Sequence, residues 1–465
     1  MIYKTEIEAG NLSLPGATSV GVRAGPFLFF GAQTPINMET GRLVSDFSRD
    51  LPEEARRQLT TGMLGLDLRL GRILSQAWCI YHNLQSILAR QGCSLDNVVR
   101  QRIFLKDMRD MASLEKVILA FMPNERPATT IVGATNAGAN QEIAVQADFI
   151  VLANKAGVSK ENISVPGLDP LTAPFPLATR VGQFIFMSAM AGADPETGRL
   201  VNRIDELSPD DREIAPQPYD AKEEAGIAQC LTTMRHIRRI LESQGAPFLG
   251  SLIHTNSWLR FPSVEASHVY RARQRLFTGS GSFPVASGKF VSGVRKGDAL
   301  LEYEIVAFIP PKGPADSRLE ISMAPSNYTH WNVPALKAGP FVFTRGEVSS
   351  EPSVPRFISK FSDLEDEGRF LPYGRCHPEK SIMAQAWFVY KRLKSYTEAY
   401  GTSMENVAHQ TVYMTNPADY PACERIATLF FGPKLPPTTV VPCLDSSPYP
   451  DLCELEIELV AVAKE

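Results

Sequence analysis

Three segments of this 465-residue chain resemble one another and differ at one position that could bind an anion. They read "NERPATTIVGATN" (124–136), "GSFPVASGKFVSG" (281–293) and "PKLPPTTVVPCLD" (433–445). When they are aligned, Arg126 lies opposite Phe283 and Leu435. A guanidinium can grip a carboxylate through two parallel N–H donors, whereas phenyl and isobutyl groups donate no hydrogen bond. The pattern indicates that only the first of the three segments keeps a cationic group at this position.

Titratable side chains also recur in a second set of three related segments. Each of these segments lies at the end of one of three similar stretches of the sequence. These segments alternate as strands do and read "EIAVQADFIVLA" (142–153), "LLEYEIVAFIP" (300–310) and "ELEIELVAVA" (454–463). Their matching positions are Gln146, Glu302 and Glu456. Strand alternation puts Gln146 and Asp148 on one face. Because glutamine does not titrate, any acid or base must be Asp148, Glu302 or Glu456.

The elements that would position these residues also repeat. Similar windows begin at Gln76, Gln229 and Gln385, at offsets of 153 and 156 residues. Each window starts as an amphipathic helix, stops at a glycine and continues as a strand. A second helix and the closing strand follow. This order predicts three tandem α+β units, with helices on one face of a mixed sheet. We place the units at residues 1–156, 157–314 and 315–465.

The run "GCSLDNVVRQRIFLKDM", the "RPATTIV" segment and the closing strand "LEIELVAVA" resemble the Rid family of reactive intermediate deaminases, also called L-PSP endoribonucleases. The resemblance implies the chorismate-mutase-like fold of that family, whose members form homotrimers with a ligand cleft at each subunit interface. Three fused copies therefore suggest a pseudo-trimer around a false threefold axis. The resemblance also implies hydrolysis of enamines or imines to ketones and ammonia, without a cofactor.

Family roles can be transferred position by position. The carboxylate-binding arginine maps to Arg126, and the water-activating glutamate maps to Glu302 and Glu456, with Gln146 in the first copy. Aromatic or small polar residues that wall the family's cleft map to Phe175, Ser188, Trp331, Asn332 and Arg345. Arg345 is also a candidate second cation in a different cleft. No copy contains both the arginine and the glutamate, so we expect Asp148, Glu302 or Glu456 to supply the acid or base.

Three functions fit this pattern. The first is a hydrolase or deaminase acting on a small carboxylated imine, enamine or related C–N compound. The second is a chorismatase-like enzyme, in which Glu302 or Glu456 protonates a leaving group of a carboxylated ring substrate. The third is a non-catalytic small-molecule-binding protein with degenerate sites. An acid or base close to Arg126 would favour catalysis. Extra segments at 45–74, 203–226 and 361–382 either shape the clefts or form surface loops.

Composition excludes several other classes of function. The chain is 44% hydrophobic and 21% charged, with a net charge of −4, which disfavours nucleic-acid binding. No apolar run reaches the roughly 18 residues of a membrane span. The seven cysteines form no C-x-x-C pair, and we interpret Cys376, His377 and Glu379 as an ordinary loop without a metal. We expect no cofactor, a cytoplasmic location and a small-molecule carboxylate as the partner.

The repeats generate a prediction about assembly. If three copies in one chain replace three subunits, light scattering should give the mass of one chain, or of two chains if pseudo-trimers dimerise. A stable assembly of three chains, arranged as a conventional trimer of one copy each, would contradict this interpretation.

Overall fold

Three β-sheets, each with helices packed against it, make up the part of the chain that is described in this computed structural model. The described residues are 4–7, 18–135, 141–260, 266–278, 283–309, 333–351, 356–371, 381–444 and 453–463. Each of the three sheets contains both parallel and antiparallel strand pairs and has helices packed against it, so the predicted α+β class is confirmed. We call each sheet with its helices a unit.

The first unit has a sheet in the order β1-β2-β3-β6-β4-β5-β12. Its strands are β1 (Lys4–Ile7), β2 (Gly21–Ala24), β3 (Phe27–Gln33), β4 (Val98–Leu105), β5 (Ala128–Gly133), β6 (Val145–Leu152) and β12 (Gly293–Val294). Its helices are α1 (Phe47–Asp50), α2 (Glu53–Leu59), α3 (Leu64–Arg90) and α4 (Met111–Phe121). Only β4 and β5 are parallel, because α4 carries the chain back between them.

The second unit has a sheet in the order β11-β10-β13-β9-β8-β7. Its strands are β7 (Lys160–Ile163), β8 (Ala178–Val181), β9 (Phe184–Met187), β10 (Leu252–Leu259), β11 (Val285–Phe290) and β13 (Leu301–Phe308). Its helices are α5 (Pro209–Ile214), α6 (Ala221–Ser243), α7 (Phe248–Ser251) and α8 (Ser267–Phe277). As in the first unit, the closing strand lies in the middle of the sheet.

The third unit has a sheet in the order β14-β15-β21-β19-β20, with β16 paired to β21. Its strands are β14 (Ala335–Ala338), β15 (Phe341–Thr344), β16 (Glu347–Val348), β19 (Val407–Met414), β20 (Thr438–Pro442) and β21 (Leu455–Val462). A small hairpin pairs β17 (Ser350–Glu351) with β18 (Arg356–Phe357). The helices are α10 (Ser381–Ala399) and α11 (Tyr420–Phe431).

Two features differ from the sequence interpretation. Helix α3 begins at Leu64, so part of the segment expected to be extra is the first turns of this long helix. Strand β12, from the stretch assigned to the second unit, completes the first sheet by pairing with β5. Gly133 permits this pairing, because a Cβ there would lie 2.5 Å from Ser292 Oγ. The first two units are therefore joined by backbone hydrogen bonds as well as by side chains.

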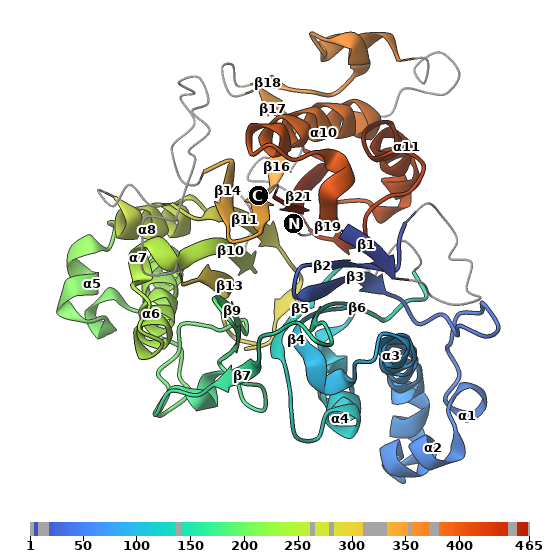
Figure 1. Ribbon diagram of the computed structural model, residues 1–465. Helices are drawn as coiled ribbons and strands as arrows, with labels where there is room; N and C mark the ends of the chain where they lie inside the picture. Colours follow the sequence, from blue (N-terminus) through green and yellow to red (C-terminus); the bar gives the residue numbers. More distant parts are fainter. Residues whose placement is uncertain are drawn as a thin grey trace.

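The three sheets face one another at the centre of the molecule, and the long helices lie at its periphery (Figure 1). Phe27, Phe184 and Phe341 meet there, one from each sheet, with ring centroids 5.6–6.0 Å apart. These rings belong to an apolar cluster that draws buried residues from all three units. Burial of such aromatic surface is the main apolar contribution to holding the units together.

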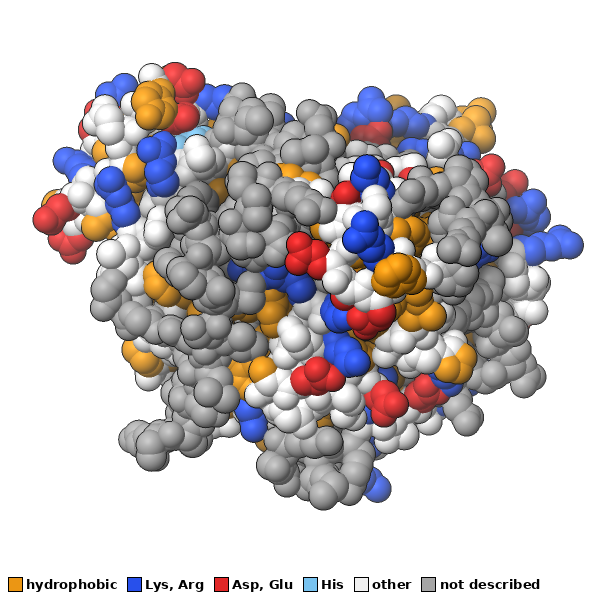
Figure 2. Space-filling view, turned by 90° about the horizontal axis from the view of Figure 1, so that it is seen from above, with side chains coloured by type: hydrophobic (Ala, Val, Ile, Leu, Met, Phe, Trp, Pro, Cys, Tyr) orange, Lys and Arg blue, Asp and Glu red, His pale blue; other side chains and the backbone are white. Residues whose placement is uncertain are grey.

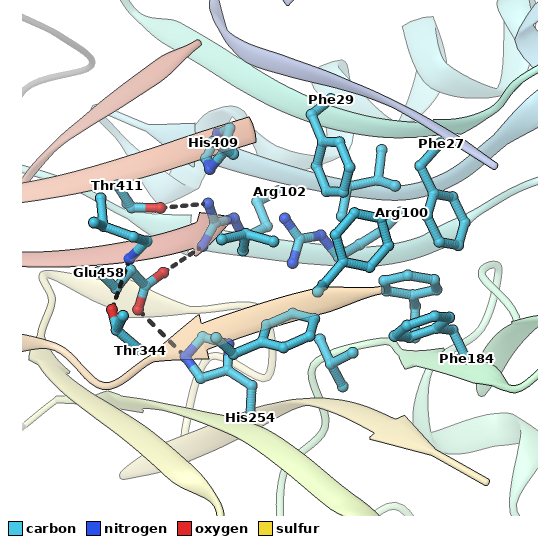
Figure 3. A pocket seen from close by; sticks show the side chains of 17 residues that line it. Phe27, Phe29, Arg100, Arg102, Phe184, His254, Thr344, His409, Thr411 and Glu458 are labelled. Carbon is cyan, nitrogen blue, oxygen red and sulfur yellow. Dashed lines mark hydrogen bonds and ion pairs between the residues drawn. The ribbon is translucent and has the colours of Figure 1, made fainter. Parts of the chain in front are cut away.

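Charged side chains lie beside these rings, in what we call the central cluster: Arg100, Arg102, Asp148, His254, Glu304, His409 and Glu458. All are more than nine-tenths buried. Arg102 Nη2 lies 2.7 Å from Asp148 Oδ2 in its own sheet, and Nη1 lies 3.4 Å from Glu458 in the third unit. His254 of the second unit lies 3.3 Å from the other Glu458 oxygen (Figure 3). The cluster thus links the three units.

Electrostatic pairing keeps these buried acids ionised. Burial alone would raise the pKa of Asp148, but Arg102 and Arg100 hold it below its usual value. Likewise, His254 and Arg102 hold the pKa of Glu458 well below its usual value despite its burial. Burial lowers the pKa of His409 to about 3, so this imidazole is neutral. The cavity beside these groups has a volume of only about 30 Å³, enough for a water molecule or two.

The central cluster leads to a stability prediction. Arg102→Met leaves Asp148 and Glu458 buried with fewer cations, and we expect it to lower the free energy of unfolding by about 3–5 kcal/mol. Arg109→Met is the matched control, because Arg109 pairs with Asp107 at the surface, with its side chain 79% exposed. That control should cost less than about 1 kcal/mol. Equal denaturation midpoints for the two variants would show that the cluster does not hold the units together.

Candidate functional site

A cavity of about 250 Å³ lies where the first unit meets the second. Met111 and Glu115 from α4 form one wall, and the second unit supplies the remaining lining. Its charged lining residues are Glu115, Arg295, Lys296 and Glu302, and its apolar lining includes Pro170 and Leu171. The volume is close to the lower end of small-molecule pockets, so a compact metabolite would fit.

Glu302 supplies a buried carboxyl group to this cavity. It is the second residue of β13 and is only 2% exposed. Its Oε1 accepts a hydrogen bond of 2.7 Å from the Lys296 backbone N–H, while Oε2 has no hydrogen-bond partner among the described residues. Burial raises the pKa of Glu302 to about 7. A carboxyl with one unused oxygen and a pKa near neutrality is suited to donate and accept protons.

Two cationic residues, Arg295 and Lys296, line the same cavity as Glu302. Arg295 Nε lies 3.1 Å from Glu115 Oε1, and Nη2 donates to the Ala173 carbonyl oxygen. The guanidinium also lies 5.3 Å from the ring centroid of Phe175. These contacts fix its plane and leave Nη1 without a hydrogen-bond partner among the described residues. The exposed Lys296 ammonium likewise has no ion-pair partner in the described part of the chain.

Arg126 lies at the same contact between units but is not part of the cavity lining. Its Nη1 donates to the Pro174 carbonyl oxygen at 2.9 Å, and its Nη2 donates to the Pro123 carbonyl oxygen at 2.6 Å. The second unit is therefore the neighbour that faces Arg126. Both contacts are to backbone carbonyls, so the guanidinium helps to hold the segment around the cis Ala173–Pro174 bond. Its predicted role in carboxylate binding stays a prediction.

Other predicted residues of this contact are structural neighbours of the cavity. Phe175 is buried beneath the Arg295 guanidinium. Ser188 Oγ donates to the Pro176 carbonyl oxygen at 2.7 Å and accepts from the Thr129 backbone N–H at 2.9 Å. Ser188 thus joins the first two units and has no contact with the cavity lining.

The corresponding contact between the second and third units is closed by side chains. Lys289, which is fully buried, forms an ion pair with Glu456, and its Nζ lies 4.1 Å from the Tyr413 ring centroid. Burial raises the pKa of Glu456 to about 7, although Lys289 partly offsets this effect. Gly346 is required here, because any Cβ would overlap Glu456 Oε1. The Lys289 side chain thus occupies the space beside this carboxylate.

The remaining predicted residues lie away from the cavity. Gln146 donates to the Val440 carbonyl oxygen at 2.6 Å, at the contact of the third unit with the first. Asp148 belongs to the central cluster, where Arg102 binds both of its oxygens. Arg345 Nε donates to Glu347 within the third unit at 3.0 Å. Trp331 and Asn332 lie outside the described residues, as do Cys376, His377 and Glu379.

Sequence reasoning missed Arg295, Lys296 and Glu115. A signal was present in "VRKGDALLEYE", where Arg295 and Lys296 lie seven and six positions before Glu302. Gly297 follows directly after these two basic residues. Glu115 could not be found in this way, since it lies on a different unit. Among the described residues, no group of His, Cys, Asp and Glu could hold a metal ion. No described helix is long and apolar enough to cross a bilayer.

The expectation that this protein does not bind nucleic acid stays a prediction. On the face seen in Figure 2, Lys and Arg side chains alternate with Asp and Glu among the described residues. A binding surface for a phosphate backbone would need a continuous basic stripe.

Comparison with known proteins supports the resemblance for the first unit. Residues 56–150 match the family model described as Endoribonuclease L-PSP. The match spans α3, α4, β4 and β5 and ends within β6, the closing strand, whereas β1, β2, β3 and β12 of the first sheet lie outside it. A RutC family protein of Pyrococcus abyssi is 27% identical over 117 residues, which are 25% of this chain and 72% of that protein. This region of the chain is thus similar to proteins of the L-PSP, or Rid, family.

Further relatives include the mitochondrial protein MMF1 of Saccharomyces cerevisiae, which is 30% identical over 76 residues, covering 16% of this chain and 52% of that protein. Because MMF1 is described as mitochondrial, the cytoplasmic location stays a prediction. The solved structure of yeast Mmf1 aligns with a TM-score of 0.25 and 19% identity, over 33% of this chain and 100% of that one. A chorismatase structure aligns with a TM-score of 0.45 and 10% identity, over 79% of this chain and 93% of that one.

The closed contact between the second and third units gives a pH-dependent prediction. Lys289→Met leaves Glu456 buried without its cation, so its pKa should rise further above that of the unfolded chain. An acid with a raised folded-state pKa destabilises the fold at pH values above that pKa, and this cost vanishes as pH falls toward the unfolded value. We therefore expect a loss of about 3–5 kcal/mol at pH 8 and a much smaller loss at pH 5.

The matched control is the double variant Lys289→Met/Glu456→Gln, which removes both charges. It should recover most of the stability lost at pH 8, as measured by chemical denaturation. If Lys289→Met is equally destabilised at both pH values, loss of packing rather than an unpaired carboxylate is responsible.

Proposed function

We propose that this protein is a cofactor-independent hydrolase of the Rid type, which acts on a small imine, enamine or related C–N compound in the Glu302 cavity. The observation that carries the proposal is the unused Glu302 oxygen, buried in a cavity that also holds two cations. The match of residues 56–150 to the L-PSP family model is consistent with this class of reaction.

Glu302 would both donate and accept protons during the reaction. In its neutral form it protonates the imine nitrogen, which makes the attached carbon more electrophilic. The resulting carboxylate takes a proton from the attacking water, so that a new C–O bond forms. When the carbinolamine collapses, Glu302 gives the proton taken from water to nitrogen, the C–N bond breaks and ammonia leaves. The hydroxyl proton passes to Glu302 as the C=O bond of the ketone forms, which restores the neutral carboxyl. Orientation and proton transfer suffice for this step, because an imine carbon is already electrophilic.

We further propose that the three units replace the subunits of a trimer, as a pseudo-trimer. Their sheets share an order in which the closing strand lies centrally, and their long helices lie outside (Figure 1). In a symmetric trimer the three clefts must be identical, whereas one chain can specialise each of them. Here, Glu302 faces a cavity and Glu456 faces Lys289, which supports a single working site per chain.

The two alternative functions, a chorismatase-like enzyme and a binding protein, predict different roles for Glu302. A chorismatase-like enzyme would use the neutral Glu302 carboxyl to protonate a vinyl ether, and a carboxylated ring would be consumed without ammonia release. A binding protein would retain ligand affinity without turnover. The buried carboxyl with a pKa near 7 favours an enzyme, because a binding site for an anion would not need a proton donor.

Glu302→Gln tests the proposal, because the amide keeps the shape but cannot exchange the proton. With 2-imino acids formed in the assay by an amino acid oxidase, we expect ammonia release to fall by a factor of about 10²–10⁴. In the wild-type protein the rate should decline as pH rises through about 7, because Glu302 then loses its proton.

Glu161→Gln is the matched control, since Glu161 is an exposed residue of β7 in the same unit. It should leave the rate and its pH profile unchanged. If Glu302→Gln keeps full activity, or if the wild-type rate does not change between pH 6 and pH 8, Glu302 is not the acid and the proposed function is wrong.

A further inference from the structure

Arg295 is held in place by groups from two units while part of its guanidinium remains available to the cavity. Glu115 on α4 binds Nε, the Ala173 carbonyl accepts from Nη2, and the Phe175 ring lies against the plane. This is how a planar cation is pre-organised, since its orientation is fixed before any ligand arrives. Nη1 is left without a hydrogen-bond partner among the described residues, and both Arg295 and Lys296 line the cavity.

The charges that line the cavity specify the charge of a ligand. Arg295 and Lys296 contribute two positive charges, and Glu115 contributes one negative charge. With Glu302 neutral, the net charge of the lining is therefore +1. A ligand with one negative charge would balance it, whereas a dianion would leave an excess negative charge in a partly desolvated site, which is unfavourable.

We propose that Arg295 and Lys296 bind the anionic group of the ligand in this cavity, and that Glu115 of the first unit restricts that group to a single negative charge. This assignment rests on the proposed function only in placing the substrate in the Glu302 cavity. It transfers the anion-binding role from Arg126, whose Nη atoms both donate to backbone carbonyls, to a residue in a different unit.

The assignment also explains why the site requires two units. Glu302, Arg295 and Lys296 belong to the second unit, but the group that orients Arg295 and sets the net charge belongs to the first. Displacement of α4 would free Arg295 and remove the negative charge from the lining. Affinity for a monoanion is therefore a property of the contact between units, and it cannot be reproduced by the second unit alone.

Isothermal titration calorimetry with two small probes tests the proposal on the full-length protein. Pyruvate carries one negative charge, and malonate carries two at neutral pH while being similar in size. We expect the wild-type protein to bind pyruvate more tightly than malonate, with about one site per chain. Arg295→Met should weaken both probes by about tenfold to a hundredfold, the effect of losing a charge-assisted hydrogen bond.

Glu115→Gln separates charge selection from a structural role. The amide keeps the size and a hydrogen-bonding oxygen, but the lining becomes more positive by one charge. The ratio of malonate affinity to pyruvate affinity should then rise by about tenfold, a change that a loss of folding would not produce. Arg180→Met, which alters an arginine of β8 outside the cavity, is the control and should leave both affinities unchanged.

Several results would overturn the assignment. The assignment is wrong if Arg295→Met folds yet binds pyruvate normally, if Glu115→Gln leaves the affinity ratio unchanged, or if Arg126→Met alone abolishes binding. Should Arg295→Met fail to fold, as judged by thermal unfolding, Arg295→Lys replaces it, and a point charge should still weaken pyruvate by several fold.

Failure of this inference can be distinguished from failure of the proposed function. Glu302→Gln should bind pyruvate and lose turnover. If turnover depends on Glu302 but binding does not depend on Arg295, this assignment is wrong and the proposed reaction stands. If binding depends on Arg295 but Glu302→Gln turns over normally, the anion site stands and the proposed reaction is wrong.

Discussion

The pairing of buried charges across the three sheets is the constraint on which the other features of this molecule depend. Arg102 of the first unit needs Glu458 of the third, and Glu458 is also next to His254 of the second. A buried charge is tolerated only when its partner is in place, so the three contacts must form together. Because these partners differ from unit to unit, the chain cannot exchange one unit for another without leaving charges unpaired.

The three units also differ from one another at the contacts between them, outside the central cluster. At equivalent positions of the closing strands, Glu302 has an unused oxygen, Glu456 is bound by Lys289, and Gln146 donates to a backbone carbonyl. Two of the three positions are thus satisfied within the protein itself. The third combines a desolvated acid, a cavity and two nearby cations, which is the combination that chemistry on a small anionic substrate requires.

The sequence predicted much of this organisation because it is encoded locally. Helical spacing and terminal glycines located the long helices, and Gly92 indeed has a positive φ of 67°. The alignment of closing strands found Glu302. The sequence did not reveal the contact between Arg295 and Glu115, because this contact depends on how two units dock and no local pattern records that. The sequence also could not show that the Pro123 and Pro174 carbonyls accept hydrogen bonds from Arg126, whose role in carboxylate binding stays a prediction. The central cluster was missed although Arg100 and Arg102 alternate along β4 with Ile103 and Leu105, which pack in the core of the first unit.

The most direct test of the account is a crystal structure of the protein soaked with pyruvate. The account predicts density for one pyruvate per chain, with its carboxylate at Arg295 and its oxo carbon next to Glu302. The contact closed by Lys289 and Glu456 should contain no ligand. Pyruvate bound at all three contacts between units, or at Arg126 with the Glu302 cavity empty, would contradict the claim that one specialised cavity carries the function.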